Sequence, residues 1–168
     1  MRLFIAINFD TETKSKIIEV QNKLRECATG RFTSPENLHL TVVFLGEVED
    51  YRAIKLCMDK SFTEEIELNF SGVGSFRSDI YWIGIKENPA LNRLYRNLCR
   101  DLQEYGYKAD VKEIFKPHIT LAREVEADKA KINIDFEEFG MIANRLSLMK
   151  SERIRGKLTY TEIYSTKI

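Results

Sequence analysis

An internal repeat limits the folds that this chain can adopt. The apolar run 3–7 (Leu-Phe-Ile-Ala-Ile) is similar to 81–85 (Tyr-Trp-Ile-Gly-Ile), which follows it by 78 positions. The candidate helix caps Asp10 and Asn88 have the same separation, and an amphipathic helical pattern follows each of them. We therefore expect two copies of one unit that begins with a strand and continues as a helix, packed about a pseudo-twofold axis.

Each copy continues into a strand that starts with one of the chain's two histidines. The motif 39–42 (His-Leu-Thr-Val) is similar to 118–121 (His-Ile-Thr-Leu), 79 positions later. Because alternate residues of a strand point to the same face, each histidine lies beside a threonine while its apolar neighbours point into the core. Packing about the pseudo-twofold axis would bring His39 and His118 to face each other across a cleft.

The rest of the chain supplies further strands and helices, and no Gly/Ser-rich linker divides it. The predicted strands are 3–8, 39–44, 66–73, 81–86, 118–123, 145–150 and 158–164. The predicted helices are 11–27, a second around 51–58, and a third between Pro89 and Gly106.

Charge and composition exclude several classes of protein. The 26 Lys and Arg residues balance 26 Asp and Glu, so the chain does not bind nucleic acid through bulk charge, and any phosphate contact comes from a local cluster. An apolar fraction of 43% with 31% charged residues favours a globular protein over a disordered one. The apolar run at the N-terminus is too short for a signal sequence or a membrane span.

The three cysteines are predicted to be free thiols. Cys27, Cys57 and Cys99 form no Cys-x-x-Cys pair, and each falls in a segment with a helical pattern. Neither a disulfide framework nor a zinc site fits this spacing. The cysteines therefore indicate a reducing, cytoplasmic compartment.

Two imidazoles and two hydroxyls that line one groove suit acid–base chemistry on a phosphodiester. Since the ordinary pKa of histidine is ~6.5, one ring can be neutral while the other is protonated. The neutral ring takes a proton from the attacking oxygen, and the protonated ring donates one to the leaving oxygen. The hydroxyls of Thr41 and Thr120 can donate to the non-bridging phosphoryl oxygens. Two imidazoles with no carboxylate or thiolate make a poor metal site, so no metal or cofactor is expected.

Longer stretches around both motifs resemble a known family. The chain resembles the RNA 2′,3′-cyclic phosphodiesterase (2′–5′ RNA ligase) family of the two-histidine phosphoesterase superfamily. The similar stretches are 1–7, 35–46, 116–123 and 148–151, together with Tyr160. The similarity spans nearly the whole chain, although 51–80 matches only in element order. Met149 stands where many relatives have an aromatic residue, and this departure from the family pattern concerns stacking on the terminal base rather than the chemistry.

With the repeat, this resemblance predicts an α+β protein whose duplicated β-α-β units have pseudo-twofold symmetry. It implies mostly antiparallel sheets that face a central cleft, with residues 1–168 forming a single two-lobed domain. It also implies hydrolysis of a terminal 2′,3′-cyclic phosphate to a 2′-phosphate, with His39 as proton donor and His118 as proton acceptor. Members of the family also join RNA ends through a 2′–5′ linkage and reverse that joining.

Several other residues are candidate substrate contacts. Arg123 follows His118 by five positions, where the family often has arginine; it either binds a phosphate or is a solvated charge at a strand end. Phe115 and Tyr160 either stack on a base or belong to the core. Lys150, beside Ser151 in the similar tail, joins a basic cluster that either binds the RNA backbone or forms a charged hairpin turn. The other members of this cluster are Arg153, Arg155 and Lys157.

Two other functions remain open at the level of sequence. One is a phosphodiesterase that acts on a small cyclic nucleotide, such as an ADP-ribose cyclic phosphate. The other is a non-catalytic protein that holds the terminal phosphate of RNA in the same cleft. For the leading hypothesis we expect RNA ends, including tRNA fragments, as partners, no membrane, and a monomer.

Overall fold

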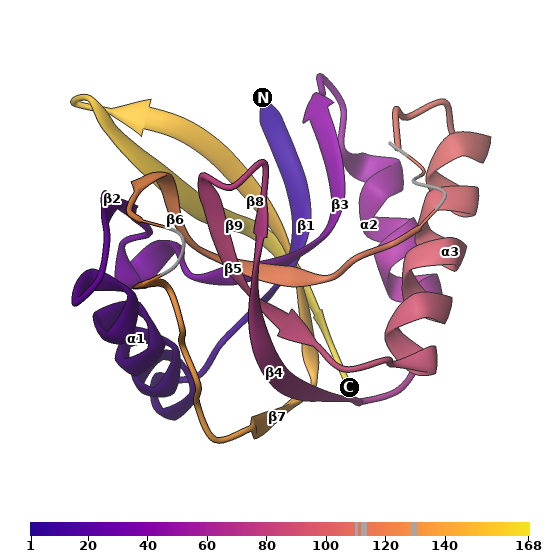
Figure 1. Cartoon of the computed structure of the whole chain (residues 1–168). Coiled ribbons are helices and arrows are strands. Elements are labelled where there is room, and N and C mark those ends of the chain that lie inside the picture. Colours follow the sequence, from indigo (N-terminus) through magenta and orange to yellow (C-terminus); the bar gives the residue numbers. More distant parts are fainter. Residues whose placement is uncertain (110, 112–113, 129–130) are drawn as a thin grey trace.

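Two antiparallel sheets and three α-helices make up the described part of the chain, which in this computed structural model covers residues 1–109, 111, 114–128 and 131–168 (Figure 1). The elements in chain order are β1 (Arg2–Asn8), α1 (Thr11–Arg25), β2 (Thr29–Phe32), the 3₁₀ helix η1 (Pro35–Asn37), β3 (His39–Glu47), α2 (Arg52–Ser61), β4 (Ile66–Phe76), β5 (Ile80–Ile85), α3 (Pro89–Glu104), β6 (His118–Glu126), β7 (Phe139–Ala143), β8 (Arg145–Ile154) and β9 (Lys157–Lys167). Sheet A has the strand order β3-β1-β8-β9, and sheet B has the order β2-β6-β5-β4-β7. The expected α+β class with antiparallel sheets is confirmed.

The predicted repeat corresponds to β1-α1-β3 and β5-α3-β6. Each copy pairs its two strands antiparallel, β1 with β3 and β5 with β6. Both expected caps are present: Asp10 Oδ1 accepts a hydrogen bond from Thr13 N at 2.8 Å, and Asn88 Oδ1 accepts one from Leu91 N at 3.0 Å. Equivalent capping satisfies one of the backbone donors that each helix start leaves open.

The helices pack on the sheet of the other copy. Helix α1 contacts β6 and β7 of sheet B, whereas α2 and α3 contact β9 and β3 of sheet A. Figure 1 shows α1 on one side of the molecule and the α2–α3 pair on the other. The Gln21 side chain, 1% exposed, fixes α1 to sheet B because its Nε2 donates to the carbonyl oxygens of Leu121 and Thr33, both at 3.0 Å. The two copies are therefore interlocked through their helices.

A β-bulge interrupts each histidine strand at the same place. In β3 the cross-strand register shifts between Ile5 and Ala6 of β1, and in β6 it shifts between Tyr81 and Trp82 of β5. Each bulge inserts one extra residue, so two consecutive residues point into the core. These buried pairs are Val42 with Val43 and Leu121 with Ala122.

The bulges decide which side chains accompany the histidines. Without a bulge, the fifth residue after His39 or His118 would point to the opposite face, because side chains alternate along a strand. The extra residue reverses the alternation, so Phe44 and Arg123 return to the face of their own histidine. The two copies thus carry an aromatic ring and a guanidinium at equivalent positions.

One buried apolar cluster contains residues from both sheets and all three α-helices. The expected inward neighbours of the histidines belong to it: Leu40, Val42, Ile119 and Leu121 are at most 3% exposed. Among the described residues, no helix has the length and apolar character needed to cross a membrane.

The structure corrects two details of the sequence prediction. Helix α1 ends at Arg25, so Cys27 lies beyond the helix and is only half-buried, while Cys57 and Cys99 are buried in α2 and α3; all three are free thiols. The edge strands β2 and β7 were not predicted. Strand β2 has only four residues, including Thr29 and Gly30, and β7 contains Gly140, so neither has the pattern of a half-buried strand.

Candidate active site

The two histidines occupy the first positions of β3 and β6 and have the same local geometry. His39 Nδ1 lies 2.7 Å from the carbonyl oxygen of Asn37, and His118 Nδ1 lies 2.8 Å from that of Lys116. Since a carbonyl only accepts, Nδ1 carries the proton in both neutral rings. Each ring is thereby held by the backbone two residues earlier, with Nε2 as the basic nitrogen.

His39 Nε2 lies 2.7 Å from Thr41 Oγ1, as expected for residues two apart on one strand face. In the neutral ring Nε2 accepts, so the Thr41 hydroxyl donates to it. A ligand that binds at Nε2 has to displace or share this hydrogen bond. Thr41 is therefore placed to exchange its hydrogen-bond partner when a ligand atom binds at Nε2.

The two histidine strands lie close together although they belong to different sheets. Strand β3 contacts β6, and the charges of His118 and Arg123 reach His39. Burial is the main cause that lowers the pKa of His39, the hydrogen bond to Asn37 opposes it, and the two cationic groups lower the pKa further. His39, His118 and Arg123 therefore form one electrostatic unit.

The lowered pKa of His39 gives a pH-dependent stability. The unfolded chain binds a proton at this residue below pH ~6.5, whereas the folded chain binds it only at lower pH. The free energy of unfolding should therefore fall as the pH drops from 6.5 through the folded pKa. The variant His39→Gln should show a shallower fall, measured by urea unfolding between pH 5 and 7.5. Parallel curves for the parent and the variant would contradict this.

Two aromatic rings contact each histidine. The Phe4 and Tyr160 rings lie 5.0 and 5.2 Å from the His39 ring, and the Tyr160 ring meets it edge-on. On the other sheet, Phe76 and Trp82 lie 4.9 and 6.1 Å from His118. These rings pack against the flanks of both imidazoles and support their orientation.

The comparisons with known proteins fit this arrangement. The chain matches the family model of the 2′-5′ RNA ligase superfamily over residues 9–155. The chain belongs to this superfamily. A relative from Thermotoga maritima, named RNA 2′,3′-cyclic phosphodiesterase, is 30% identical over 164 residues, which cover 90% of this chain and 87% of the relative. A protein of the same name from Archaeoglobus fulgidus is 33% identical over 129 residues, covering 73% of this chain and 72% of the relative.

A solved structure has the same fold over almost the whole chain. Escherichia coli LigT in complex with 3′-AMP is 28% identical and has a TM-score of 0.82, covering 99% of this chain and 96% of LigT. Its complex with NADP+ gives a TM-score of 0.84 at 28% identity.

In the present chain, most of the predicted contact residues lie near the histidines. Ser151 pairs across the strands with Tyr160, on the sheet face that carries Phe4 and His39; we call this the inner face of sheet A. Arg123 lies near Tyr160: burial raises the pKa of the Tyr160 phenol, and the charge of Arg123 counteracts this. On sheet B, Thr120 pairs with Trp82 on the face of His118.

Two predicted contacts lie elsewhere. Lys150 follows Met149, which faces Phe4 on the inner face, so its side chain points to the opposite face of sheet A, where it pairs with Glu152 at 3.4 Å. Phe115 stacks on Tyr95 of α3, with ring centroids 4.1 Å apart and planes 8° from parallel. Strand alternation and core packing thus exclude both from the group around the histidines.

Sequence reasoning missed several residues of the site. Phe4, Phe76 and Trp82 contact the histidines, and Phe44 occupies the position equivalent to Arg123. Phe44 is 43% exposed, and the guanidinium of Arg2 lies 5.2 Å from its ring centroid. Phe44 follows His39 by five positions, as Arg123 follows His118, and this equal spacing could have identified Phe44 as a site residue. The spacing places both side chains on the histidine face only if the strand contains a bulge, which the sequence does not show.

Trp82 depends on a glycine for its place beside His118. A Cβ at Gly74 would lie 2.3 Å from the indole ring, so only glycine fits under it. The Trp82 Nε1 is buried without a hydrogen-bond partner among the described residues. Gly74→Ala should cost about 1–3 kcal/mol of stability and shift the His118 ring resonances in NMR, whereas Trp82→Phe should cost less than about 1.5 kcal/mol. Equal stability and unchanged resonances in Gly74→Ala would contradict the packing argument.

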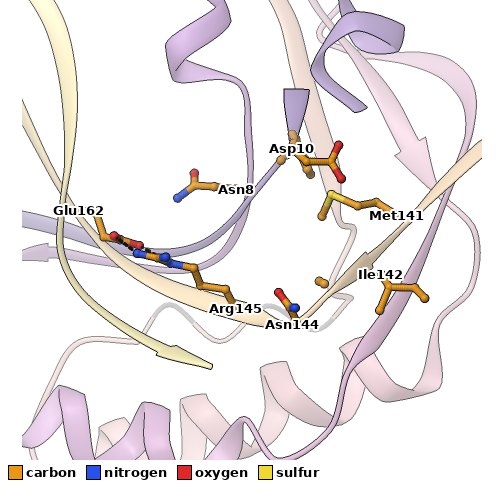
Figure 2. A pocket seen from close by; sticks show the side chains of 9 residues that line it. Asn8, Asp10, Met141, Ile142, Asn144, Arg145 and Glu162 are labelled. Atoms are coloured by element: carbon orange, nitrogen blue, oxygen red, sulfur yellow. Dashed lines mark hydrogen bonds and ion pairs between the residues drawn. The ribbon is translucent and has the colours of Figure 1, made fainter. Parts of the chain in front are cut away.

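Beyond His39, the inner face of sheet A ends in a pocket of about 410 Å³ (Figure 2). Asn8, the cross-strand partner of His39, lines it and donates from Nδ2 to Met149 Sδ at 3.5 Å. Glu162 closes one side through an ion pair with Arg145. The remaining lining residues are Phe9, Asp10, Met141, Ile142, Ala143 and Asn144.

Proposed function

We propose that this protein hydrolyses the terminal 2′,3′-cyclic phosphate of RNA to a 2′-phosphomonoester. The observation that best supports this is the pair of histidines, each fixed at Nδ1 by a carbonyl two residues earlier and close enough to interact. The relatives named RNA 2′,3′-cyclic phosphodiesterase support the choice of substrate. RNA ends, tRNA fragments among them, are the expected partners of a monomeric, single-domain protein in the cytoplasm.

In the proposed mechanism His118 Nε2 takes a proton from water as its oxygen attacks phosphorus. The bond from phosphorus to O3′ breaks, and protonated His39 donates its Nε2 proton to O3′. The hydroxyls of Thr41 and Thr120 and the guanidinium of Arg123 bind the non-bridging oxygens, where negative charge increases. Ser151 and Tyr160 line the side occupied by the terminal nucleotide. If a 5′-hydroxyl of RNA attacks phosphorus in place of water, O3′ leaves and a 2′–5′ linkage forms. In the reverse reaction O3′ attacks phosphorus and the 5′-oxygen leaves, with the same two residues exchanging the protons.

The environment of His39 bears on its role as proton donor. Burial lowers its pKa in the unliganded protein, which favours the neutral ring. A phosphate anion at Nε2 supplies the opposite charge that stabilises the imidazolium and raises the pKa again. In this scheme His39 gains its proton together with the substrate.

The first test is turnover of an RNA that ends in a 2′,3′-cyclic phosphate, with EDTA present and the 2′- and 3′-phosphate products resolved. We expect a 2′-phosphate product at an unchanged rate in EDTA. Loss of activity in EDTA that a divalent ion restores would contradict the two-histidine mechanism. Binding without turnover would instead favour a non-catalytic protein that holds RNA ends, with small cyclic nucleotides as the next substrates to assay.

A substrate with a better leaving group separates the two histidine roles. A 3′-thio analogue expels a thiolate, which needs no proton from the enzyme. His39→Ala should therefore recover most of its lost rate on this analogue, whereas His118→Ala should not. Recovery by His118→Ala alone would exchange the two assignments.

A further inference from the structure

The β8–β9 hairpin extends beyond the rest of sheet A (Figure 1). Strand β1 pairs with β8 only as far as Ser151, whereas β8 and β9 stay paired to Ile154 and Lys157. The connecting residues Arg155 and Gly156 both have positive φ angles, 52° and 77°, as a tight two-residue turn requires. The projecting part of the hairpin is thus a two-stranded arm.

This arm is attached to the segment that holds His39. Asn37, 7% exposed, donates from Nδ2 to the carbonyl oxygen of Leu158 in β9 at 3.0 Å, and Lys157 Nζ lies 2.9 Å from Glu36 Oε1. The carbonyl oxygen of the same Asn37 accepts from His39 Nδ1. One residue therefore connects the arm to the imidazole.

The arm continues the inner face of sheet A as a cationic surface. Tyr160 and Ser151 form a pair on that face, so the next pair on the same face is Arg153 with Leu158. Arg153 donates to the carbonyl oxygen of Gly156, and Arg155 is exposed at the tip. Neither guanidinium pairs with a carboxylate in the described residues. Since Arg123 lies near Tyr160, cations follow the path from the histidines to the tip.

The opposite end of the inner face has a different charge. The pocket drawn in Figure 2 includes the carboxylates of Asp10 and Glu162 with a single guanidinium, Arg145, which is paired to Glu162. A chain of phosphates is repelled by carboxylates and attracted by unpaired guanidinium groups. Charge therefore favours the arm over the pocket as the path of a polynucleotide.

We propose that the β8–β9 arm binds the sugar–phosphate backbone of RNA upstream of the cyclic phosphate, and that Asn37 couples this contact to the position of His39. This inference rests on the proposed function, because it concerns the remainder of the same substrate. A cyclic mononucleotide reaches the histidines but not Arg153 or Arg155. The arm is therefore a determinant of substrate length.

The test compares a nucleoside 2′,3′-cyclic phosphate with a ten-nucleotide RNA that has the same cyclic end. The double variant Arg153→Ala/Arg155→Ala should lower kcat/KM on the RNA by roughly tenfold or more, while the ratio of RNA to mononucleotide turnover falls by the same factor. The slope of log(kcat/KM) against log[salt] should become shallower by about 1.4 for two lost phosphate contacts. The matched control Arg96→Ala/Lys108→Ala removes two exposed cations from the α3 side of the molecule and should change neither quantity.

Asn37→Ala tests the coupling. It should lower kcat on both substrates, because His39 loses its anchored support, and it should also reduce the preference for RNA. Adding the two arginine substitutions should then cost much less than in the parent, as for groups that act together. Additive losses would refute the coupling, provided that thermal unfolding shows each variant folded.

Two results would overturn the path itself. The first is an arm variant that behaves like the control. The second is a selective loss of RNA turnover in Ile142→Trp, a variant that fills the mouth of the pocket. If the parent turns over neither substrate, the proposed function fails by itself. Fluorescence anisotropy of the same RNA, labelled at its 5′ end, then measures its affinity for the parent, the arm variant and the control. The arm proposal predicts weaker binding in the arm variant alone.

Discussion

Replacing His118 with alanine should lower kcat for cyclic phosphate hydrolysis by about 10²- to 10⁴-fold, and His39→Ala should have an effect of similar size. Each substitution removes one of two proton transfers that occur in the same step. Since the two residues act as a unit, the double variant should be little slower than either single variant. Single-turnover assays in EDTA measure all three rates.

The controls for this prediction separate chemistry from folding. Both rings are held by carbonyls only two residues away, so neither variant disturbs a long-range contact of the Nδ1 atoms. His118→Ala should therefore bind the RNA end with affinity within a few-fold of the parent, whereas His39→Ala should bind it more weakly because it lacks the imidazolium that the phosphate stabilises. A fully active His118→Ala protein would rule out the two-histidine mechanism, and loss of binding along with turnover in His118→Ala would indicate a structural role for that ring.

The variant Gln21→Leu should lower the free energy of unfolding by about 1–3 kcal/mol. The Gln21 Nε2 donates to the carbonyl oxygens of Thr33 and Leu121. Leucine would leave the Thr33 oxygen without this donor, whereas the Leu121 oxygen keeps its hydrogen bond from Thr33 N at 3.0 Å. Each buried group that loses its hydrogen bond costs about 1–3 kcal/mol. Urea unfolding measures the change as a shift of the midpoint at constant slope.

The neighbouring exposed residue supplies the matched control. Asn22→Leu makes a similar change one position along α1, where the side chain faces solvent, and should cost within about 0.5 kcal/mol. If both variants lose the same stability, the loss does not come from the buried hydrogen bonds, and the two carbonyl contacts contribute little. If only Gln21→Leu is destabilised, the hydrogen bonds between α1 and sheet B contribute the predicted free energy.

Local signals in the sequence were sufficient for much of this fold. Asp10 and Asn88 marked the starts of two helices because a capping side chain acts on donors three residues away. The repeat then related the copies without any knowledge of their packing. The sequence did not show that each helix packs on the sheet of the other copy, because a buried glutamine such as Gln21 has the same local pattern whichever sheet it contacts.

The contacts around the histidines were predicted less well because they depend on strand parity. One residue of shift turns a side chain to the other face, and this is why Lys150 points away from the site while Ser151 does not. The bulge in β6 has the opposite effect on Arg123: it turns this side chain back to the face of His118. A bulge arises from cross-strand pairing, so the strand's own residues do not show it.

The order of strands in sheet A has a consequence for synthesis on the ribosome. Strand β1, the first to emerge, lies between β3 and β8, so one of its two partners is not made until residue 145 and beyond. At a synthesis rate of about 5–20 residues per second, the apolar β1 remains without its partner β8 for roughly 7–30 s. During that interval a nascent chain has an open, aggregation-prone edge beside residues 3–7, and we expect it to depend on chaperones that shield such edges.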